Sequence, residues 1–158
     1  MPRLRATWSW QIARLGPPAA AMAVVDASIV VDWVAPDVDP DAPAGQLLVR
    51  LARAATPLYA PRLLLEEVAN ALITGCRRHR WDGAAADDAY QRLRRLPITL
   101  VDDAVDRDRA WDLSRRYDEH PIYDMLYAAV AERLRDQLFT ADERLRRRLA
   151  ALEFVVGP

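Results

Sequence analysis

Residues 22–34 read MAVVDASIVVDWV and bring two different patterns together at one junction. The apolar run at residues 23–25 is short and rich in valine, which indicates a buried β-strand, and helical periodicity begins at Ser28. Asp26 stands between the two, at the end of the predicted strand. Its side chain could cap the following helix, but the carboxyl ends of parallel strands are also where functional residues gather.

The rest of the chain repeats this alternation of short apolar runs and helical patterns. It is typical of an α/β fold in which helices cover a mostly parallel sheet. We predict strands at residues 23–25, 58–59, 98–101, 138–140 and 154–156. We predict helices near residues 28–34, 45–54, 62–79, 83–96, 104–117, 122–135 and 142–149, with a loop at 35–44. Pro61 and Pro121 are expected in the first turns of their helices, where proline is tolerated.

Composition narrows the possible classes of protein. A chain of 158 residues with 52% hydrophobic and 28% charged residues fits one globular domain. No stretch approaches the roughly 18 apolar residues of a membrane span. We expect a cytoplasmic protein because the N-terminal segment is a poor match to a secretory signal. All 22 basic residues are arginine, and the single cysteine, Cys76, cannot form a disulfide within one chain. The only histidines are His79 and His120, which argues against a Cys/His zinc site, so we expect any metal to be held by oxygen.

The first 21 residues do not share this pattern. Three arginines precede the apolar residues 17–25, as in a secretory signal, but Asp26 and Asp32 interrupt the run. We expect residues 1–21 to be a flexible N-terminal extension that is dispensable for activity, and residues 22–158 to form the domain. An upstream start codon would also account for the extension.

Two further aspartates occupy positions that suggest a site. Asp142 follows the predicted strand 138–140, although Thr140 and Glu143 would also spell a capping box in which Asp142 only favours the helix dipole. Asp124 shares a helical face with Tyr127 and Ala128. An ionised carboxylate on an apolar face needs a partner, a cation or a proton. An arginine partner or a helix cap would be the alternative to a ligand role.

The fourth acid is ambiguous in the sequence. Glu66 and Glu67 flank the apolar stripe of one predicted helix on opposite sides, so periodicity cannot choose between them. Four acids at one end of a sheet would repel one another unless divalent cations neutralised them. Oxygen ligands favour Mg²⁺ or Mn²⁺, and a cation held by carboxylates suits phosphodiester hydrolysis.

Four segments resemble successive motifs of PIN-domain proteins, specifically VapC-type toxins. They read VVDASIVVDW (24–33), EVANAL (67–72), YDMLYAAVAE (123–132) and TADERL (140–145), and the resemblance covers residues 23–156. It implies a PIN-like three-layer sandwich with a mostly parallel central sheet. Carried over by position, the catalytic and metal-binding carboxylates are Asp26, Glu67, Asp124 and Asp142, with Ser28, Asn70 and Thr140 as supporting polar residues. Glu67 is preferred to Glu66 because it directly precedes Val-Ala-Asn.

The resemblance also implies an activity and partners. We expect an endoribonuclease dependent on Mg²⁺ or Mn²⁺, the toxin of a VapBC-type toxin–antitoxin system, which forms a homodimer and binds a cognate VapB-type antitoxin. Arg144 is expected to contact RNA because it lies just after Asp142. A non-catalytic PIN-like RNA-binding module and a metal-dependent DNA nuclease remain the alternatives.

Overall fold

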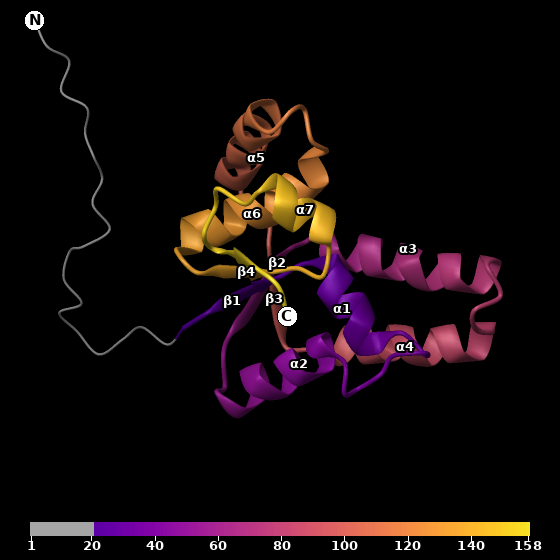
Figure 1. The fold of residues 1–158 in the computed structure, drawn as a ribbon. Coiled ribbons are helices and arrows are strands. Elements are labelled where there is room, and N and C mark those ends of the chain that lie inside the picture. Colours follow the sequence, from indigo (N-terminus) through magenta and orange to yellow (C-terminus); the bar gives the residue numbers. More distant parts are fainter. Residues whose placement is uncertain (1–20) are drawn as a thin grey trace, which may run out of the picture.

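The computed structural model describes residues 21–158, and within them five strands form one sheet (Figure 1). The strands are β1 (Ala23–Val25), β2 (Leu58–Pro61), β3 (Ile98–Val101), β4 (Gln137–Phe139) and β5 (Val155–Val156). Their order is β3-β2-β1-β4-β5, and every neighbouring pair runs parallel. The predicted α/β fold with a parallel sheet is confirmed. The expectations for residues 1–20 lie outside the described residues.

Helices cover both faces of the sheet, as the predicted three-layer sandwich requires. The helices are α1 (Ala27–Val34), α2 (Pro43–Arg53), α3 (Leu64–Arg77), α4 (Gly83–Arg95), α5 (Ala104–Arg116), α6 (Ile122–Leu134) and α7 (Glu143–Arg148). Figure 1 shows α5, α6 and α7 on one side of the sheet and α1, α2 and α4 on the other, while α3 and α4 extend together away from the sheet. None of the helices between residues 21 and 158 is long and apolar enough to cross a membrane.

The central strand β1 lies in the middle of the core. Val24 and Val25 are fully buried, as expected for a parallel strand that is covered by helices on both faces. On one side α6 contributes Met125 and Tyr127, both fully buried, and on the other α1 contributes Ile29. The burial of β1 therefore fixes the position of Asp26, the residue that follows it.

Two proline predictions were wrong. Pro61 is the last residue of β2, and α3 begins only at Leu64. β2 tolerates this proline because its pairing with β1 reaches only Val24 and Tyr59. The missing N–H of Pro61 therefore leaves no carbonyl of β1 without a hydrogen-bond donor. Pro121 is the N-cap residue of α6 rather than part of its first turn, and its φ of −51° suits that position.

The ends of two other predicted elements also differ. The loop predicted at residues 35–44 is shorter, because α2 begins at Pro43, whose fixed φ and missing N–H suit the first helical position. Strand β4 ends at Phe139, one residue before the predicted end. Thr140 therefore lies in the connection to α7, at the carboxyl edge of the sheet.

Candidate active site

The strand order creates a switch point between β1 and β4. From β1 the chain passes to β2 and β3 on one side, and it then returns to place β4 against the other side of β1. Val25 and Phe139 are paired, so the residues that follow them leave the sheet side by side. Open parallel sheets bind ligands at such switch points, beyond the carboxyl ends of the strands.

Asp26 is buried at this switch point and holds several hydrogen bonds. Its Oδ2 accepts from the hydroxyls of Ser28 at 2.7 Å and Thr140 at 2.6 Å, and its Oδ1 accepts from the backbone N–H of Ala27 at 2.7 Å. The bond from Thr140 joins the end of β4 to the end of β1. Asp26 is also the N-cap of α1, so its structural and proposed chemical roles coexist.

The charge of Asp26 is not fully compensated by these donors. Burial raises the pKa of this carboxyl, and the nearby Asp124 carboxylate raises it further. The hydrogen bonds from Thr140, Ser28 and Ala27 lower the pKa but do not restore the ordinary value. A cation beside Asp26 would favour the ionised form.

Glu67 reaches the same region from the first half of α3. Its Oε2 accepts a hydrogen bond from the hydroxyl of Tyr127, which lies on α6. Burial is the main cause of the raised pKa of Glu67, and the carboxylates of Asp26 and Asp124 raise it further. The three acids are therefore close enough to repel one another, although they come from three separate elements.

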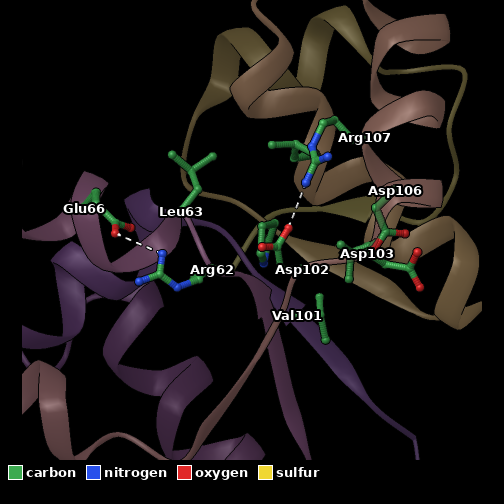
Figure 2. A pocket seen from close by; sticks show the side chains of 11 residues that line it. Arg62, Leu63, Glu66, Val101, Asp102, Asp103, Asp106 and Arg107 are labelled. Carbon is green, nitrogen blue, oxygen red and sulfur yellow. Dashed lines mark hydrogen bonds and ion pairs between the residues drawn. The ribbon is translucent and has the colours of Figure 1, made fainter.

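Glu66 lies elsewhere. Its side chain is 60% exposed and forms an ion pair with Arg62 at 3.7 Å. Arg62 and Glu66 line a cavity of about 290 Å³ at the ends of β2 and β3. Figure 2 shows this pair, together with the bond from Arg107 to Asp102 in the same cavity. The structure thus gives Glu66 a solvated ion pair and brings Glu67 to the switch point, a distinction that helical periodicity could not make.

Asp124 lies in the first turn of α6 and is partnered by a histidine. Its Oδ2 is 2.6 Å from Nε2 of His120, which precedes the helix, and its side chain is 32% exposed. The partner is thus neither of the two alternatives considered from the sequence, an arginine or a helix amide. The half-buried position leaves Asp124 reachable from solvent.

Asp142 is the most exposed of the four acids and caps α7. Its Oδ1 accepts from the backbone N–H groups of Arg144 at 2.8 Å and Leu145 at 3.1 Å. The capping-box alternative was wrong in detail, because Asp142 itself is the N-cap. Thr140 instead accepts from the N–H of Asp142 while it donates to Asp26. Asp142 is not among the groups that shift the pKa of Asp26 or Glu67.

The supporting residues divide into two groups. Ser28 and Thr140 bond directly to Asp26, and Ser28 Oγ also accepts from the N–H of Ala141 at 3.0 Å. Asn70 is exposed on α3, and within residues 21–158 no hydrogen bond joins its side chain to another site residue. Arg144 is exposed in the first turn of α7, and its backbone N–H bonds to Asp142. Two of the three predicted supporting residues, Ser28 and Thr140, therefore lie directly around Asp26.

The donor set fits a hard divalent cation by its chemistry. Asp26, Glu67 and Asp124 supply carboxylate oxygens whose mutual repulsion a cation would relieve. Within the described residues 21–158, no three acidic, histidine or cysteine side chains already stand at the spacing of a complete ligand set. Cation binding would therefore require side chains of the site to move. Asp26 is bonded to Ser28 and Thr140, Glu67 to Tyr127 and Asp124 to His120.

Two residues of this site were not assigned by the sequence analysis. Tyr127 was named only as a neighbour of Asp124 on one helical face, and His120 was considered only as a zinc ligand. Only Tyr127 has a signal in the sequence, because it lies three residues after Asp124, a spacing that places two side chains on one helical face. His120 lies before the first residue of α6, so helical periodicity does not predict its contact with Asp124. What the sequence could not show is the partner of Tyr127, because Glu67 is 60 positions away.

Known proteins are similar to this chain in sequence and in fold. Ribonuclease VapC3 of Mycobacterium tuberculosis is 37% identical over 124 residues, which cover 78% of this chain and 85% of the relative. VapC ribonuclease Mb0985 of Mycobacterium bovis is 34% identical over 124 residues, covering 78% and 88%. The chain thus aligns with most of the length of each relative.

Solved structures agree on the fold. PAE2754 from Pyrobaculum aerophilum superposes with a TM-score of 0.64 at 21% identity, covering 88% of this chain and 90% of that one. A toxin–antitoxin complex from Klebsiella pneumoniae contains a chain with a TM-score of 0.55 at 19% identity, covering 85% and 95%. The family model described as the PIN domain matches residues 23–149. This chain therefore belongs to the PIN-domain family.

Proposed function

We propose that this protein is a metal-dependent endoribonuclease and the toxin of a VapBC-type toxin–antitoxin system. The observation that carries the proposal is the meeting of Asp26, Glu67 and Asp124 at the β1–β4 switch point, where each carboxylate lies near the others. Among residues 21–158, no arginine forms an ion pair with any of the three. Relatives named as ribonucleases support RNA as the substrate.

The residues that would hold the metal are the three converging acids, with Asp142 as a fourth ligand. Both helix amides that bond to Asp142 use Oδ1, which leaves Oδ2 available. Carboxylate oxygens suit Mg²⁺ or Mn²⁺. When bound, such an ion supplies an activated water and neutralises charge on the phosphodiester.

The chain's own residues orient these ligands. Ser28 and Thr140 fix one oxygen of Asp26 from two sides, and the N–H of Ala27 fixes the other. Because Thr140 also accepts from the N–H of Asp142, one hydroxyl ties the loop that carries Asp142 to the buried Asp26. Orientation of this kind raises the affinity of a metal site and keeps the ligands in productive geometry.

Arg144 is the arginine best placed to contact the RNA backbone. It is exposed two residues after Asp142, and arginine binds phosphate through a planar fork of donors. Several other arginines have structural partners: Arg80 pairs with Asp37, and Arg148 pairs with Asp118. Because the whole chain carries a net charge of −1, RNA binding depends on such local positive groups.

The proposed partners are a cognate VapB-type antitoxin and a second copy of this chain, with the cytoplasm as the place of action. The similarity to a chain of a toxin–antitoxin complex and to VapC proteins supports this proposal. Light scattering of the purified protein at micromolar concentration should give the mass of a dimer. A monomer throughout that range would contradict the homodimer.

The decisive experiment incubates the purified full chain with total RNA and with single-stranded DNA, in chelator and with Mg²⁺ or Mn²⁺. We expect new RNA ends at defined positions only when a divalent ion is present, and mapping those ends gives the cleavage sequence. Cleavage of DNA alone would favour the nuclease alternative. RNA binding without cleavage under every condition would favour the non-catalytic module.

A further inference from the structure

Tyr127 makes a polar contact that a core residue of α6 does not need. Its side chain is fully buried among the helices and the central sheet, yet its hydroxyl donates across to Oε2 of Glu67 on α3. A phenylalanine would fill the same space. Within the part of the chain that the structure describes, the hydroxyl adds this one hydrogen bond, which ends on a carboxylate of the candidate site.

The direction of the bond follows from the chemistry of the two groups. A phenol O–H donates and a carboxylate oxygen accepts, so Tyr127 is the donor and Oε2 of Glu67 is the acceptor.

The contact also gives the two carboxylate oxygens of Glu67 different surroundings. Oε2 is occupied by the Tyr127 hydroxyl, and no hydrogen bond to Oε1 is formed within residues 21–158. Tyr127 lies one turn after Asp124 on the same helix. One turn of α6 thus supplies an acid of the site and the group that restrains a second acid from another helix.

We propose that Tyr127 is a positioning residue for the metal-binding site: its hydroxyl holds Oε2 of Glu67 so that Oε1 is presented to the divalent cation. The inference rests on the proposed function only in taking Glu67 as a metal ligand. Groups that bond to metal ligands in this way orient them, and their loss lowers metal affinity by about 10–100-fold.

The test compares Tyr127→Phe with Tyr90→Phe in the full chain. Tyr90 is 44% exposed on α4, away from the site, so the same hydroxyl is removed where no such bond exists. Mn²⁺ affinity is measured by electron paramagnetic resonance and by thermal melts in chelator and in Mn²⁺. We expect the Mn²⁺ dissociation constant of Tyr127→Phe to rise about 10–100-fold, and that of Tyr90→Phe to equal wild type.

A double-mutant cycle separates positioning from core packing. In a Glu67→Gln background, adding Tyr127→Phe should change Mn²⁺ affinity no further, because the residue acts through the Glu67 carboxylate. An equal loss in both backgrounds, or no loss in either, would overturn the inference. So would wild-type protein that binds no Mn²⁺.

Two further results keep the inference separate from the proposed function and from folding. If wild type binds Mn²⁺ but cleaves no RNA, the ribonuclease proposal fails, while the cycle still decides the role of Tyr127. If Tyr127→Phe does not fold, as judged by circular dichroism, the tyrosine ultraviolet difference spectrum on adding Mn²⁺ replaces it. We expect that spectrum to change in wild type and not in Glu67→Gln, and an identical spectrum in both proteins would overturn the inference.

Discussion

Two buried aspartates hold a negative charge inside this fold in opposite ways. Asp106 on α5 is 3% exposed, and Asp26 after β1 is 6% exposed. Asp106 accepts a two-pronged bond from Arg133 on α6, with Nε at 2.6 Å and Nη2 at 2.7 Å. Asp26 accepts from two hydroxyls and one backbone amide, all of them neutral.

The difference lies in the counter-charge rather than in the number of hydrogen bonds. An arginine fork supplies a full positive charge in a geometry that matches a carboxylate, so the α5–α6 pair is complete. The pKa of Asp26 is raised by burial, and the one charge that shifts it is that of another acid, Asp124. A buried acid without a counter-charge is a candidate ligand site, and this contrast distinguishes the two aspartates.

The largest expected effect is on RNA cleavage. Asp26→Asn preserves size and one acceptor oxygen but removes the charge that holds the cation, so cleavage should fall about 10³-fold, several kcal/mol of barrier. The fold should survive in chelator because repulsion from Asp124 is relieved. Cleavage rates and thermal melts in chelator measure both effects. A variant that melts much earlier in chelator yet cleaves at the wild-type rate would refute the ligand role.

Removing the charge partner of the other aspartate, Asp106, should change stability and leave metal binding as it is. Arg133→Met keeps the apolar stem but leaves Asp106 buried without a charge partner, which should lower the free energy of unfolding by about 3 kcal/mol. Metal affinity should not change. Urea unfolding measures the stability, and adding Asp106→Asn to Arg133→Met should restore part of it, because neither charge then remains.

Arg109→Met provides the matched control. Arg109 bonds Glu132 with the same fork, but its side chain is 30% exposed and that of Glu132 is 38% exposed. Removal of this more solvated pair should cost about 1 kcal/mol or less. Equal losses for Arg109→Met and Arg133→Met would show that burial of Asp106 is not what makes its pair important.

The sequence was informative where local pattern decides structure. Short apolar runs located each strand and period-3.6 patterns located each helix to within a few residues, because the parallel strands are mostly apolar and the helices carry apolar stripes. The prolines were less predictable. Pro61 ends a strand because the pairing of β1 with β2 stops short of it, and this pairing depends on the tertiary structure. Asp106 also had a local signal, since it shares the buried stripe of α5 with Ala110 and Leu113.

Contacts between distant residues could not be predicted from pattern. The bond from Thr140 to Asp26 spans 114 positions, and only the pairing of β4 with β1 creates it. The choice of Glu67 over Glu66 came from resemblance, because both flank the same stripe. The physical reason, that α3 turns Glu67 toward Tyr127 and leaves Glu66 with Arg62, is visible only in the fold.

Divalent ions should stabilise the protein through the carboxylates that lack a counter-charge. At a Mg²⁺ concentration 100 times its dissociation constant, the free energy of unfolding should rise by about 2.7 kcal/mol, which raises the melting temperature by about 5–10 °C for a chain of this size. Differential scanning calorimetry with Mg²⁺ and with chelator measures the shift. Arg133→Met should keep the shift and Asp26→Asn should lose most of it; an equal shift in both variants would place the cation elsewhere.

The smallest expected effect is the dependence of stability on pH in metal-free buffer. The pKa of Glu67 is raised above its ordinary value of 4.5, so between that value and the raised one the folded protein binds more protons than the unfolded chain. Stability therefore falls as pH rises through this window. Glu67→Gln keeps an acceptor for Tyr127 but cannot ionise, so its stability should fall less than that of wild type over the same pH range.

Urea unfolding at several pH values in chelator measures the difference between the two proteins, in which the other titrating groups largely cancel. With Mg²⁺ present the wild-type trend should reverse, because the ionised carboxylate binds the cation. If the free energy of unfolding changed with pH equally in wild type and Glu67→Gln in chelator, Glu67 would be as well solvated as Glu66. The contrast with Asp106 would then rest on Asp26 alone.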